Sequence, residues 1–87
     1  MDVAVSQIRE LRKFISEITF TDVEKIKEDT LLFEEGIFDS LGFLSLVSFL
    51  NEEYGVDVTN DELSEDNFKS INAVVEYIAK KKSNPLI

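Results

Sequence analysis

Three stretches of the chain carry apolar residues at helical spacing, and this pattern constrains the fold more than any other feature. The first stretch has Ile8, Leu11, Ile15 and Ile18, with Phe14 beside them. The second has Phe43, Leu46, Val47, Leu50 and Tyr54, and the third has Ile71, Val74, Val75 and Ile78. Each set recurs with the period that places side chains on one face of an α-helix. We therefore expect three amphipathic helices that pack through these faces.

The rest of the chain allows one more short element. Thr59 and Glu62 have the spacing of a capping box, which predicts a short helix near residues 62–66. We expect helices at about residues 4–18, 40–54 and 71–82, with a long loop over residues 19–39. There is little sustained period-2 alternation. The sequence thus predicts an all-α fold, a four-helix bundle of three main helices and one short helix, in a single domain over residues 1–87.

The residue types that are missing exclude much chemistry. The chain has 87 residues and no Cys or His. It therefore has no zinc site of the common kinds, no thiol nucleophile and no Ser-His-Asp triad. Without disulfides or such metal sites, a chain of this length depends on well-packed helices for stability. If the protein takes part in chemistry, we expect the reactive group to come from elsewhere.

The charge is strongly acidic and unevenly distributed. Against 9 basic residues there are 18 acidic ones, for a net charge of -9. Twelve of the acids lie between Lys27 and Lys69, a segment with no basic residue, whereas residues 40–51 carry no charge at all. Such a chain is unsuited to nucleic acid. Two interpretations of the acidic segment remain open: a solvated surface that keeps the protein soluble, or a field that steers basic partner enzymes.

Residues 19–39 do not have the composition of a solvated linker. The apolar residues that we expect to be buried there are Phe20, Val23, Ile26, Leu31, Leu32, Phe33 and Ile37. Thr21 and Glu24 have capping-box spacing, which predicts a short turn of helix. Gly36 indicates a backbone turn before the second main helix. The loop is therefore expected to pack as a layer over the bundle.

The second main helix has a predicted cap at each end and a surplus of leucines. Either Asp39 or Ser40 can cap its start, and Gly55 suits its end. Leu41 and Leu44 lie off the core stripe, on the outer side that also holds Ser45, Ser48 and Glu52. These leucines could be scattered surface residues or could pack against the long loop, and their position beside a helix start needs an explanation.

Two other kinds of site fit the sequence poorly. An EF-hand starting at Asp57 would have Glu62 at the glycine position and Phe68 at the final glutamate position, so it is rejected and no metal site is expected. Paired carboxylates at 34–35, 52–53 and 65–66 could in principle act as acid and base. A chain this small, however, leaves little room for an enclosed substrate pocket. We expect no catalytic residues.

The sequence around Asp39-Ser40-Leu41 resembles the acyl carrier and peptidyl carrier protein family. The resemblance spans nearly the whole chain and is carried by residues 32–41, 51–56 and 67–71, which read LFEEGIFDSL, NEEYGV and NFKSI. It implies that Ser40 carries 4′-phosphopantetheine, attached from coenzyme A by a phosphopantetheinyl transferase. It also implies that the terminal thiol of this arm holds acyl or aminoacyl groups as thioesters. By the same resemblance, Asp39 would engage the transferase.

The resemblance implies further properties of the protein. Its partners would be the transferase (a holo-carrier synthase), an acyl- or aminoacyl-loading ligase and downstream synthases in fatty-acid, polyketide or related biosynthesis. The partner surface would include Asp39, Leu41, Leu44, Ser45, Ser48 and Glu52. Fatty-acid carriers usually have acidic residues along the second helix, so the neutral segment here is more similar to aminoacyl, peptidyl or D-alanyl carriers of specialised pathways.

Two alternatives of other classes stay open. One is a helical interaction module in which Ser40 is only a cap, and the other is a small enzyme that uses carboxylates. No signal peptide is visible, and the apolar-rich stretch over residues 37–50 is too short to span a membrane. We therefore expect a cytoplasmic monomer that neither inserts into membranes nor binds nucleic acid.

Overall fold

The structure is a computed structural model that describes residues 3–83 and contains only helices in that range. The elements are α1 (Val3–Thr19), η1 (Val23–Lys25), α2 (Ser40–Tyr54), η2 (Asn60–Glu62), α3 (Glu65–Phe68) and α4 (Ile71–Ser83). Here η denotes a single turn of 3₁₀-helix. The predicted all-α fold, with three main helices, one short helix and a long loop after the first helix, is confirmed.

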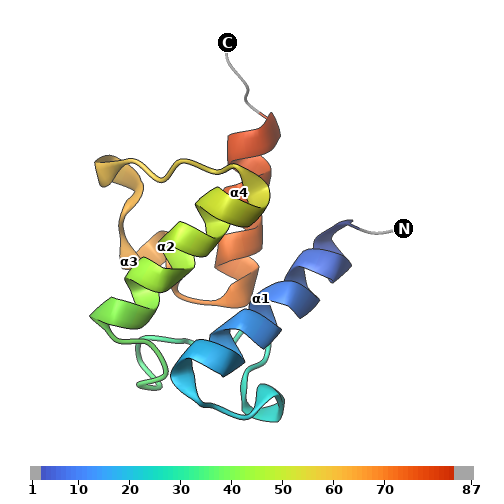
Figure 1. Ribbon diagram of the computed structural model, residues 1–87, viewed down its shortest axis with the longest axis vertical. Helices are drawn as coiled ribbons and strands as arrows, with labels where there is room; N and C mark the ends of the chain where they lie inside the picture. Colours follow the sequence, from blue (N-terminus) through green and yellow to red (C-terminus); the bar gives the residue numbers. More distant parts are fainter. Residues whose placement is uncertain (1–2, 84–87) are drawn as a thin grey trace.

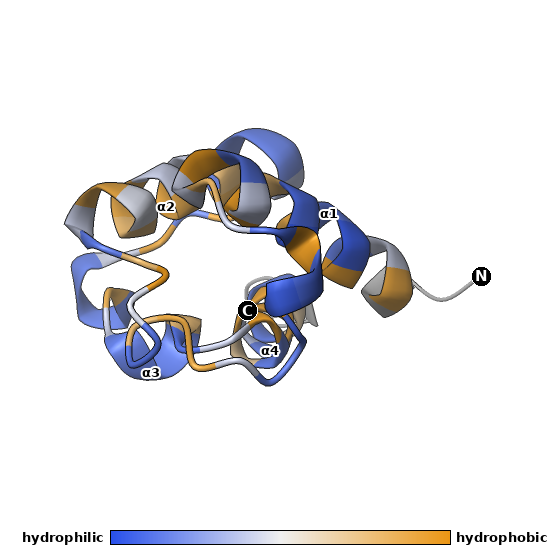
Figure 2. Cartoon of the chain, turned by 90° about the horizontal axis from the view of Figure 1, so that it is seen from below, coloured by the Kyte–Doolittle hydropathy of each residue, from blue (hydrophilic) through white to orange (hydrophobic). Residues whose placement is uncertain are grey.

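The helices form two layers. α1 and α2 run in opposite directions side by side, so the end of α1 and the start of α2 lie at the same end of the molecule (Figure 1). Seen from that end, α1 and α2 make one layer and α3 and α4 make the other (Figure 2). α1 contacts both α2 and α4, while α3 packs on α4. This arrangement leaves one side of α2 facing away from the core.

The core is built from the predicted helical faces. Leu11 and Ile15 of α1, and Leu46 and Leu50 of α2, are fully buried. The other buried apolar residues are Ile26, Leu32, Phe38, Val56, Phe68, Ile71, Val74, Tyr77 and Ile78. Burying a side chain of this size contributes about 1.5–3 kcal/mol relative to leaving it in water. The helical periodicity in the sequence therefore identified the main stabilising contacts.

The loop between α1 and α2 is only partly buried, which corrects one expectation. Ile26 and Leu32 are buried as predicted, and Phe33 and Ile37 are half-buried. Phe20, Val23 and Leu31, however, are exposed, with 96% of the Phe20 surface accessible. A loop that crosses the end of a bundle can turn only one side toward the core, so alternate apolar residues remain outside.

Phe20 also adopts an unusual backbone conformation. Its φ is +56°, a left-handed conformation that costs most L-residues roughly 1–2 kcal/mol. The backbone N–H of Thr21 donates to Ser16 O, and the Ser16 hydroxyl donates to Thr21 O. These bonds close the end of α1 and hold the chain in the turn.

The predicted turn after α1 forms without its capping box. η1 is present, but its N-cap residue Asp22 makes no side-chain hydrogen bond. The Thr21 hydroxyl instead accepts a hydrogen bond from the Thr19 hydroxyl at 3.0 Å. The side chain that the box requires is thus held by the last turn of α1.

The short helix near residues 62–66 differs from the prediction. η2 ends at Glu62, and α3 begins three residues later at Glu65. The Thr59–Glu62 capping box does form, since each side chain bonds the other residue's backbone N–H. It closes only one turn because Leu63 leaves the helical region, with φ −77° and ψ 74°. The predicted short helix is therefore present as α3, but it begins at Glu65, and the capping box belongs to the separate turn η2.

Candidate functional site

The start of α2 is capped by Asp39. Its backbone is extended, and its Oδ1 accepts a hydrogen bond from Gly42 N at 2.8 Å. The sequence left open whether Asp39 or Ser40 is the cap, and the structure decides in favour of Asp39. At the other end, Gly55 closes the helix with φ +67° and donates to Asn51 O, as predicted. Ser40 is therefore the first residue inside the helix.

Because Asp39 provides the cap, the Ser40 hydroxyl is not needed to stabilise the start of α2. Ser40 is exposed, and within residues 3–83 its side chain makes no hydrogen bond. Its backbone N–H and that of Leu41 belong to the first turn of a helix, where no intrahelical acceptor exists. The positive end of the helix dipole lies at the same place. A hydroxyl in this position can be modified without removing a cap.

The loop before α2 holds this position through backbone hydrogen bonds. The N–H groups of Ile37 and Phe38 both donate to Leu32 O, at 2.9 and 3.0 Å. Leu32 N in turn donates to Lys69 O at 2.8 Å, which connects the loop to the segment between α3 and α4. Leu32 is fully buried. The residues before Ser40 are thus anchored to the opposite layer of the molecule.

Phe38 and Gly42 fix the angle at which the loop enters α2. The Phe38 ring is buried and packs edge-on against Phe33, with ring centroids 5.5 Å apart. A Cβ atom at Gly42 would lie 3.2 Å from Phe38 Cδ1, closer than most such contacts. The missing side chain at Gly42 therefore lets the ring approach the helix. Phe38 was not among the residues expected to be buried.

The outer face of α2 brings the other predicted site residues together. Leu41 and Leu44 are 74% and 55% exposed, so they do not pack on the loop. Ser45, Ser48 and Glu52 are exposed on the same helix. We refer to these five residues as the outer face of α2. It places two uncovered leucines within the first five residues of the helix that begins with Ser40.

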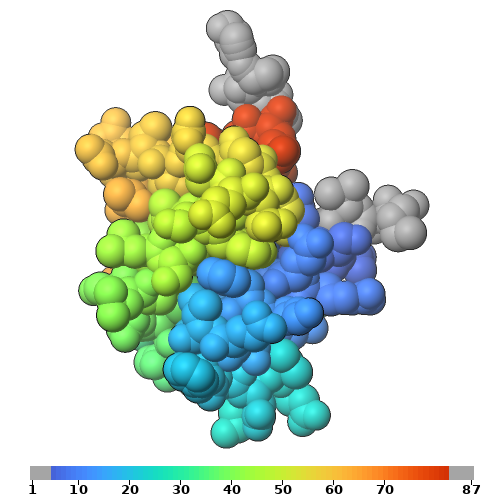
Figure 3. All heavy atoms as spheres, viewed as in Figure 1, coloured from blue at the N-terminus to red at the C-terminus, as the bar shows by residue number. Residues whose placement is uncertain are grey.

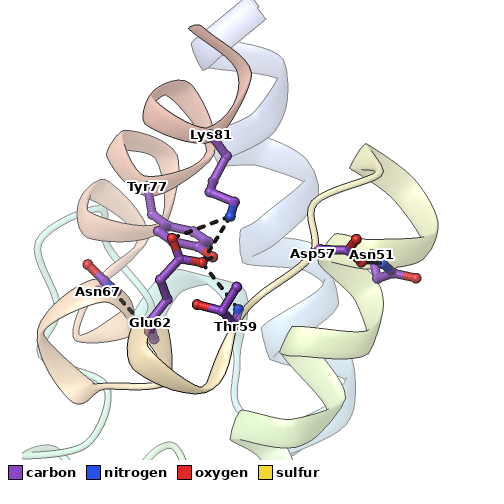
Figure 4. Close-up of polar contacts among 7 residues, drawn as sticks. All are labelled: Asn51, Asp57, Thr59, Glu62, Asn67, Tyr77 and Lys81. Atoms are coloured by element: carbon purple, nitrogen blue, oxygen red, sulfur yellow. Dashed lines mark hydrogen bonds and ion pairs between the residues drawn. The ribbon is translucent and has the colours of Figure 1, made fainter. Parts of the chain in front are cut away.

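A cluster of polar groups lies elsewhere, between η2 and α4 (Figure 4). The Glu62 carboxylate accepts hydrogen bonds from the Tyr77 hydroxyl at 2.7 Å and from Lys81 Nζ at 3.0 Å. Thr59 N donates to the same carboxylate at 3.2 Å, and the Asn67 amide donates to Glu62 O at 3.0 Å. We call Thr59, Glu62, Asn67, Tyr77 and Lys81 the Glu62 cluster.

The Glu62 cluster shifts the pKa values of two of its members, and its hydrogen bonds stabilise the fold. The hydrogen bond from Tyr77, followed by that from Lys81, lowers the pKa of Glu62 to about 2. Burial and then the bond to Glu62 raise the pKa of the Tyr77 hydroxyl. Perturbed groups often mark active sites, but here every polar atom of the carboxylate has a partner that ties η2 to α4. The capping box indicated Glu62 in the sequence, and the i, i+4 spacing of Tyr77 and Lys81 is the signal that was missed.

Two further features of the described residues concern metal sites and membrane-spanning helices. Across residues 3–83, no group of three or more acidic side chains is placed to hold a metal ion. No helix in that range is long and apolar enough to cross a membrane.

The fold and the start of α2 together define a class of protein. An all-α domain with a long loop leading to an exposed serine at a helix N-terminus is the arrangement expected of a carrier domain. The family model of the phosphopantetheine attachment site matches residues 9–78. The chain belongs to this family.

Known relatives agree with this assignment. The chain is 34% identical over 68 residues to the probable acyl carrier protein PigG of Serratia sp. (strain ATCC 39006), which covers 76% of this chain and 78% of that protein. It is 29% identical over 68 residues to a D-alanyl carrier protein of Bacillus pumilus (strain SAFR-032), covering 78% and 87% of the two chains. A D-alanyl carrier protein of Streptococcus mutans is 27% identical over 74 residues, covering 85% and 92%.

These findings confirm the predicted family, the carrier role and the cofactor. The protein is a carrier that uses phosphopantetheine. The residues at the start of α2 fit such a group, because a phosphodiester suits an exposed hydroxyl beside unpaired N–H groups at a helix N-terminus. The arm's thiol supplies the thioester chemistry that this chain, without Cys, lacks.

Proposed function

We propose that Ser40 is the attachment residue for 4′-phosphopantetheine. The main support is the structure at the start of α2. Asp39 caps the helix there, while the Ser40 hydroxyl is exposed and makes no hydrogen bond with the described residues. In the attachment reaction, Ser40 Oγ forms a bond to the phosphorus of coenzyme A that carries the pantetheine. The bond from that phosphorus to the bridging oxygen of the diphosphate breaks, adenosine 3′,5′-bisphosphate leaves, and the transferase removes the hydroxyl proton.

The chain's own residues have positioning roles in this proposal. Asp39 holds the first turn in place through Gly42 N, and the free N–H groups of Ser40 and Leu41 favour the negative charge of the phosphodiester. No side chain accepts a hydrogen bond from the Ser40 hydroxyl among the described residues. In this proposal the transferase therefore supplies the base and the catalysis.

The outer face of α2 is the proposed partner surface. Exposed leucines flanked by serines and Glu52 offer apolar contact area next to Ser40. Burying exposed apolar area of this kind against a partner favours association. The partners would be the transferase, a loading ligase and downstream synthases. In keeping with the sequence expectations, the carrier would act as a cytoplasmic monomer, without contacts to membrane or nucleic acid.

The cargo is an acyl or aminoacyl group of a specialised pathway. Relatives named as D-alanyl carriers and as an acyl carrier support both kinds of cargo. The absence of charge from residues 40–51 favours a specialised carrier over a housekeeping fatty-acid carrier. Mass spectrometry of the protein from its own cell, with release of the arm, would give the mass of the bound group and so identify it.

The attachment residue can be tested with a pair of serine variants. The purified protein is incubated with coenzyme A, magnesium and a broad transferase, and its intact mass is measured. Wild type is expected to gain one phosphopantetheine, Ser40→Ala none, and Ser64→Ala one, because Ser64 is exposed, makes no side-chain capping bond and lies outside α2. Labelling of Ser40→Ala, or an unlabelled wild type, would overturn the proposal.

The same experiment separates the alternatives of other classes. An interaction module with Ser40 as cap predicts no prosthetic group on protein isolated from its own cell, and little loss of partner binding in Ser40→Ala. Its premise is weakened because Asp39 already caps α2. An enzyme that uses carboxylates would need activity from the unmodified chain.

A further inference from the structure

A groove between α1 and α2 has a composition that the carrier role does not explain. It has a volume of about 280 Å³ and is lined by Glu10, Lys13, Phe14, Glu17, Phe49 and Glu53. We call it the α1–α2 groove. Its α2 residues, Phe49 and Glu53, lie in the second half of that helix, and neither belongs to the outer face described above. On the face of the molecule shown in Figure 3, the atoms of α1 and of this half of α2 meet along one seam.

The floor of the groove is aromatic. The rings of Phe14 and Phe49 stack with centroids 4.1 Å apart and planes inclined by 16°. Phe49 also packs edge-on against Tyr54, with centroids 6.0 Å apart. Both phenylalanines are only half-buried, so part of each ring faces the groove. The floor offers an apolar surface held in place by contacts from two helices.

The rim of the groove carries an excess of negative charge. Glu10, Glu17, Glu53 and Lys13 are all exposed. The two ion pairs found among residues 3–83 are Arg12–Glu28 and Glu62–Lys81, so neither uses a rim carboxylate. Three carboxylates thus face a single lysine around an apolar floor. The groove attracts cations and repels anions.

One wall of the groove is fixed. The Tyr54 hydroxyl donates a hydrogen bond to Glu10 Oε1, across the contact between α2 and α1. This bond holds one oxygen of the Glu10 carboxylate and leaves the other able to accept. Burial, followed by this hydrogen bond, raises the pKa of Tyr54, so the hydroxyl remains a donor throughout the physiological range. A carboxylate held in this way loses little freedom when it binds a cation.

We propose that the α1–α2 groove binds an arginine side chain on the surface of a partner protein. The methylene stem would lie on Phe14 and Phe49, and the guanidinium would donate paired hydrogen bonds to the rim carboxylates. Arginine fits better than lysine because its planar fork matches carboxylates and is more weakly hydrated.

Other occupants fit the charge less well. Nucleic acids and membranes with acidic headgroups would be repelled by the rim. A second copy of this chain carries a net charge of -9 and has only two arginines, of which Arg12 pairs with Glu28. The occupant that fits the charge of the groove is therefore a basic surface on another protein. It would contact the carrier along α1, away from the start of α2, so the inference does not depend on Ser40.

The groove can be tested by nuclear magnetic resonance titration. The probe is N-acetylarginine N-methylamide, and its control is the citrulline analogue, which has nearly the same shape but no charge. At low salt we expect saturable shifts of the amide signals of Phe14, Glu17, Phe49 and Glu53, with a dissociation constant on the order of 1–10 mM for a ligand of this size. The citrulline analogue is expected to bind at least about fivefold more weakly.

Two double variants locate the site. Glu17→Gln with Glu53→Gln should weaken arginine binding about fivefold or more, whereas Glu35→Gln with Glu65→Gln, exposed acids outside the groove, should not. All four residues are exposed, so circular dichroism should report an unchanged fold. Equal binding of the two probes, equal effects of the two double variants, or shifts spread evenly over the acidic surface would each overturn the proposal. Both variants retain Ser40, and their labelling by the transferase separately tests the attachment site.

Discussion

The start of α2 and the Glu62 cluster use their polar groups in opposite ways. At the start of α2, one side-chain hydrogen bond caps the helix while a serine hydroxyl and two leucines remain uncovered. In the Glu62 cluster, a single carboxylate receives bonds from a hydroxyl, an ammonium group and a backbone N–H. The first region is open to a partner, and the second closes the contact between η2 and α4.

The difference follows from how many helical hydrogen bonds each segment can make within itself. α2 is a helix of 15 residues whose own hydrogen bonds and buried leucines stabilise it, so its first turn can be left free. η2 has 3 residues and α3 has 4, too few to be stable alone. Side-chain bonds to α4 replace the missing helical ones. Polar pairing is therefore concentrated where the backbone is weakest, and not where the cofactor is proposed to attach.

The largest expected effect on stability comes from comparing a buried leucine with an exposed one on the two sides of α2. Leu46 is fully buried, whereas Leu44 is 55% exposed. Leu46→Ala should lower the free energy of unfolding by about 2–5 kcal/mol because it leaves a cavity. Leu44→Ala should change it by less than about 0.5 kcal/mol. Urea denaturation measures both, and a similar loss in the two variants would show that the outer face of α2 supports the fold.

The Glu62 cluster should contribute a smaller, pH-dependent amount. Glu62→Ala is expected to cost about 1–2 kcal/mol at pH 7, since the carboxylate is partly exposed and its charged bonds are partly screened. Glu62→Gln keeps hydrogen-bond acceptance but loses the charge, so it should cost less. Urea denaturation of the three proteins measures these differences.

The sign of the pH effect follows from the lowered pKa. Folding lowers the pKa of Glu62 from 4.5 to about 2, so its charged form stabilises the folded state above roughly pH 4.5. This contribution is lost as the pH falls toward 2. The stability difference between wild type and Glu62→Gln should therefore shrink between pH 5 and about pH 2. A difference that stays constant over this range would contradict the role of the charge.

The cap at the start of α2 should have an effect of about 1 kcal/mol. Asp39→Ala removes the acceptor for Gly42 N and should destabilise the protein by about that amount. Asp39→Asn keeps an acceptor and should stay close to wild type. Ser40→Ala should leave stability unchanged in thermal melts. A loss in Ser40→Ala as large as that in Asp39→Ala would mean that the serine also caps the helix.

The smallest expected effect concerns Phe20, outside both regions. Phe20→Gly should raise stability by a few tenths to about 1 kcal/mol, because glycine adopts positive φ without steric cost and the lost ring is 96% exposed. Phe20→Ala keeps the strained backbone and should be close to neutral. Urea denaturation compares the two variants. Destabilisation by both would reveal a contact of the ring that the fold requires.

The sequence predicted the parts of the fold that depend on near neighbours. The stripes of α1, α2 and α4, the glycine that ends α2 and the Thr59–Glu62 capping box all involve residues within a few positions of one another. The burial of Phe20, Val23 and Leu31 was predicted wrongly. Their side chains are apolar, but only the position of the other layer decides which side of a loop is covered.

The resemblance named Ser40 as the attachment residue, but the residue that caps α2 could be predicted only as one of a pair. Local rules allow both Asp39 and Ser40 to cap a helix, and choosing between them requires the backbone angles at the helix start. The outer side of α2 followed from helical geometry alone. That Leu41 and Leu44 stay uncovered did not, because the loop could have folded over them.

By itself, the sequence determined the helices, the concentration of acid in the middle of the chain and the resemblance to phosphopantetheine carriers. The tertiary structure decided which hydroxyl is free, which leucines face solvent, and how Glu62 meets Tyr77 and Lys81, 15 and 19 residues away. It also brought Phe14 against Phe49 to form the α1–α2 groove. The physical reason is range: helix formation and capping act over about one turn, whereas burial and pairing depend on chain segments that only folding brings together.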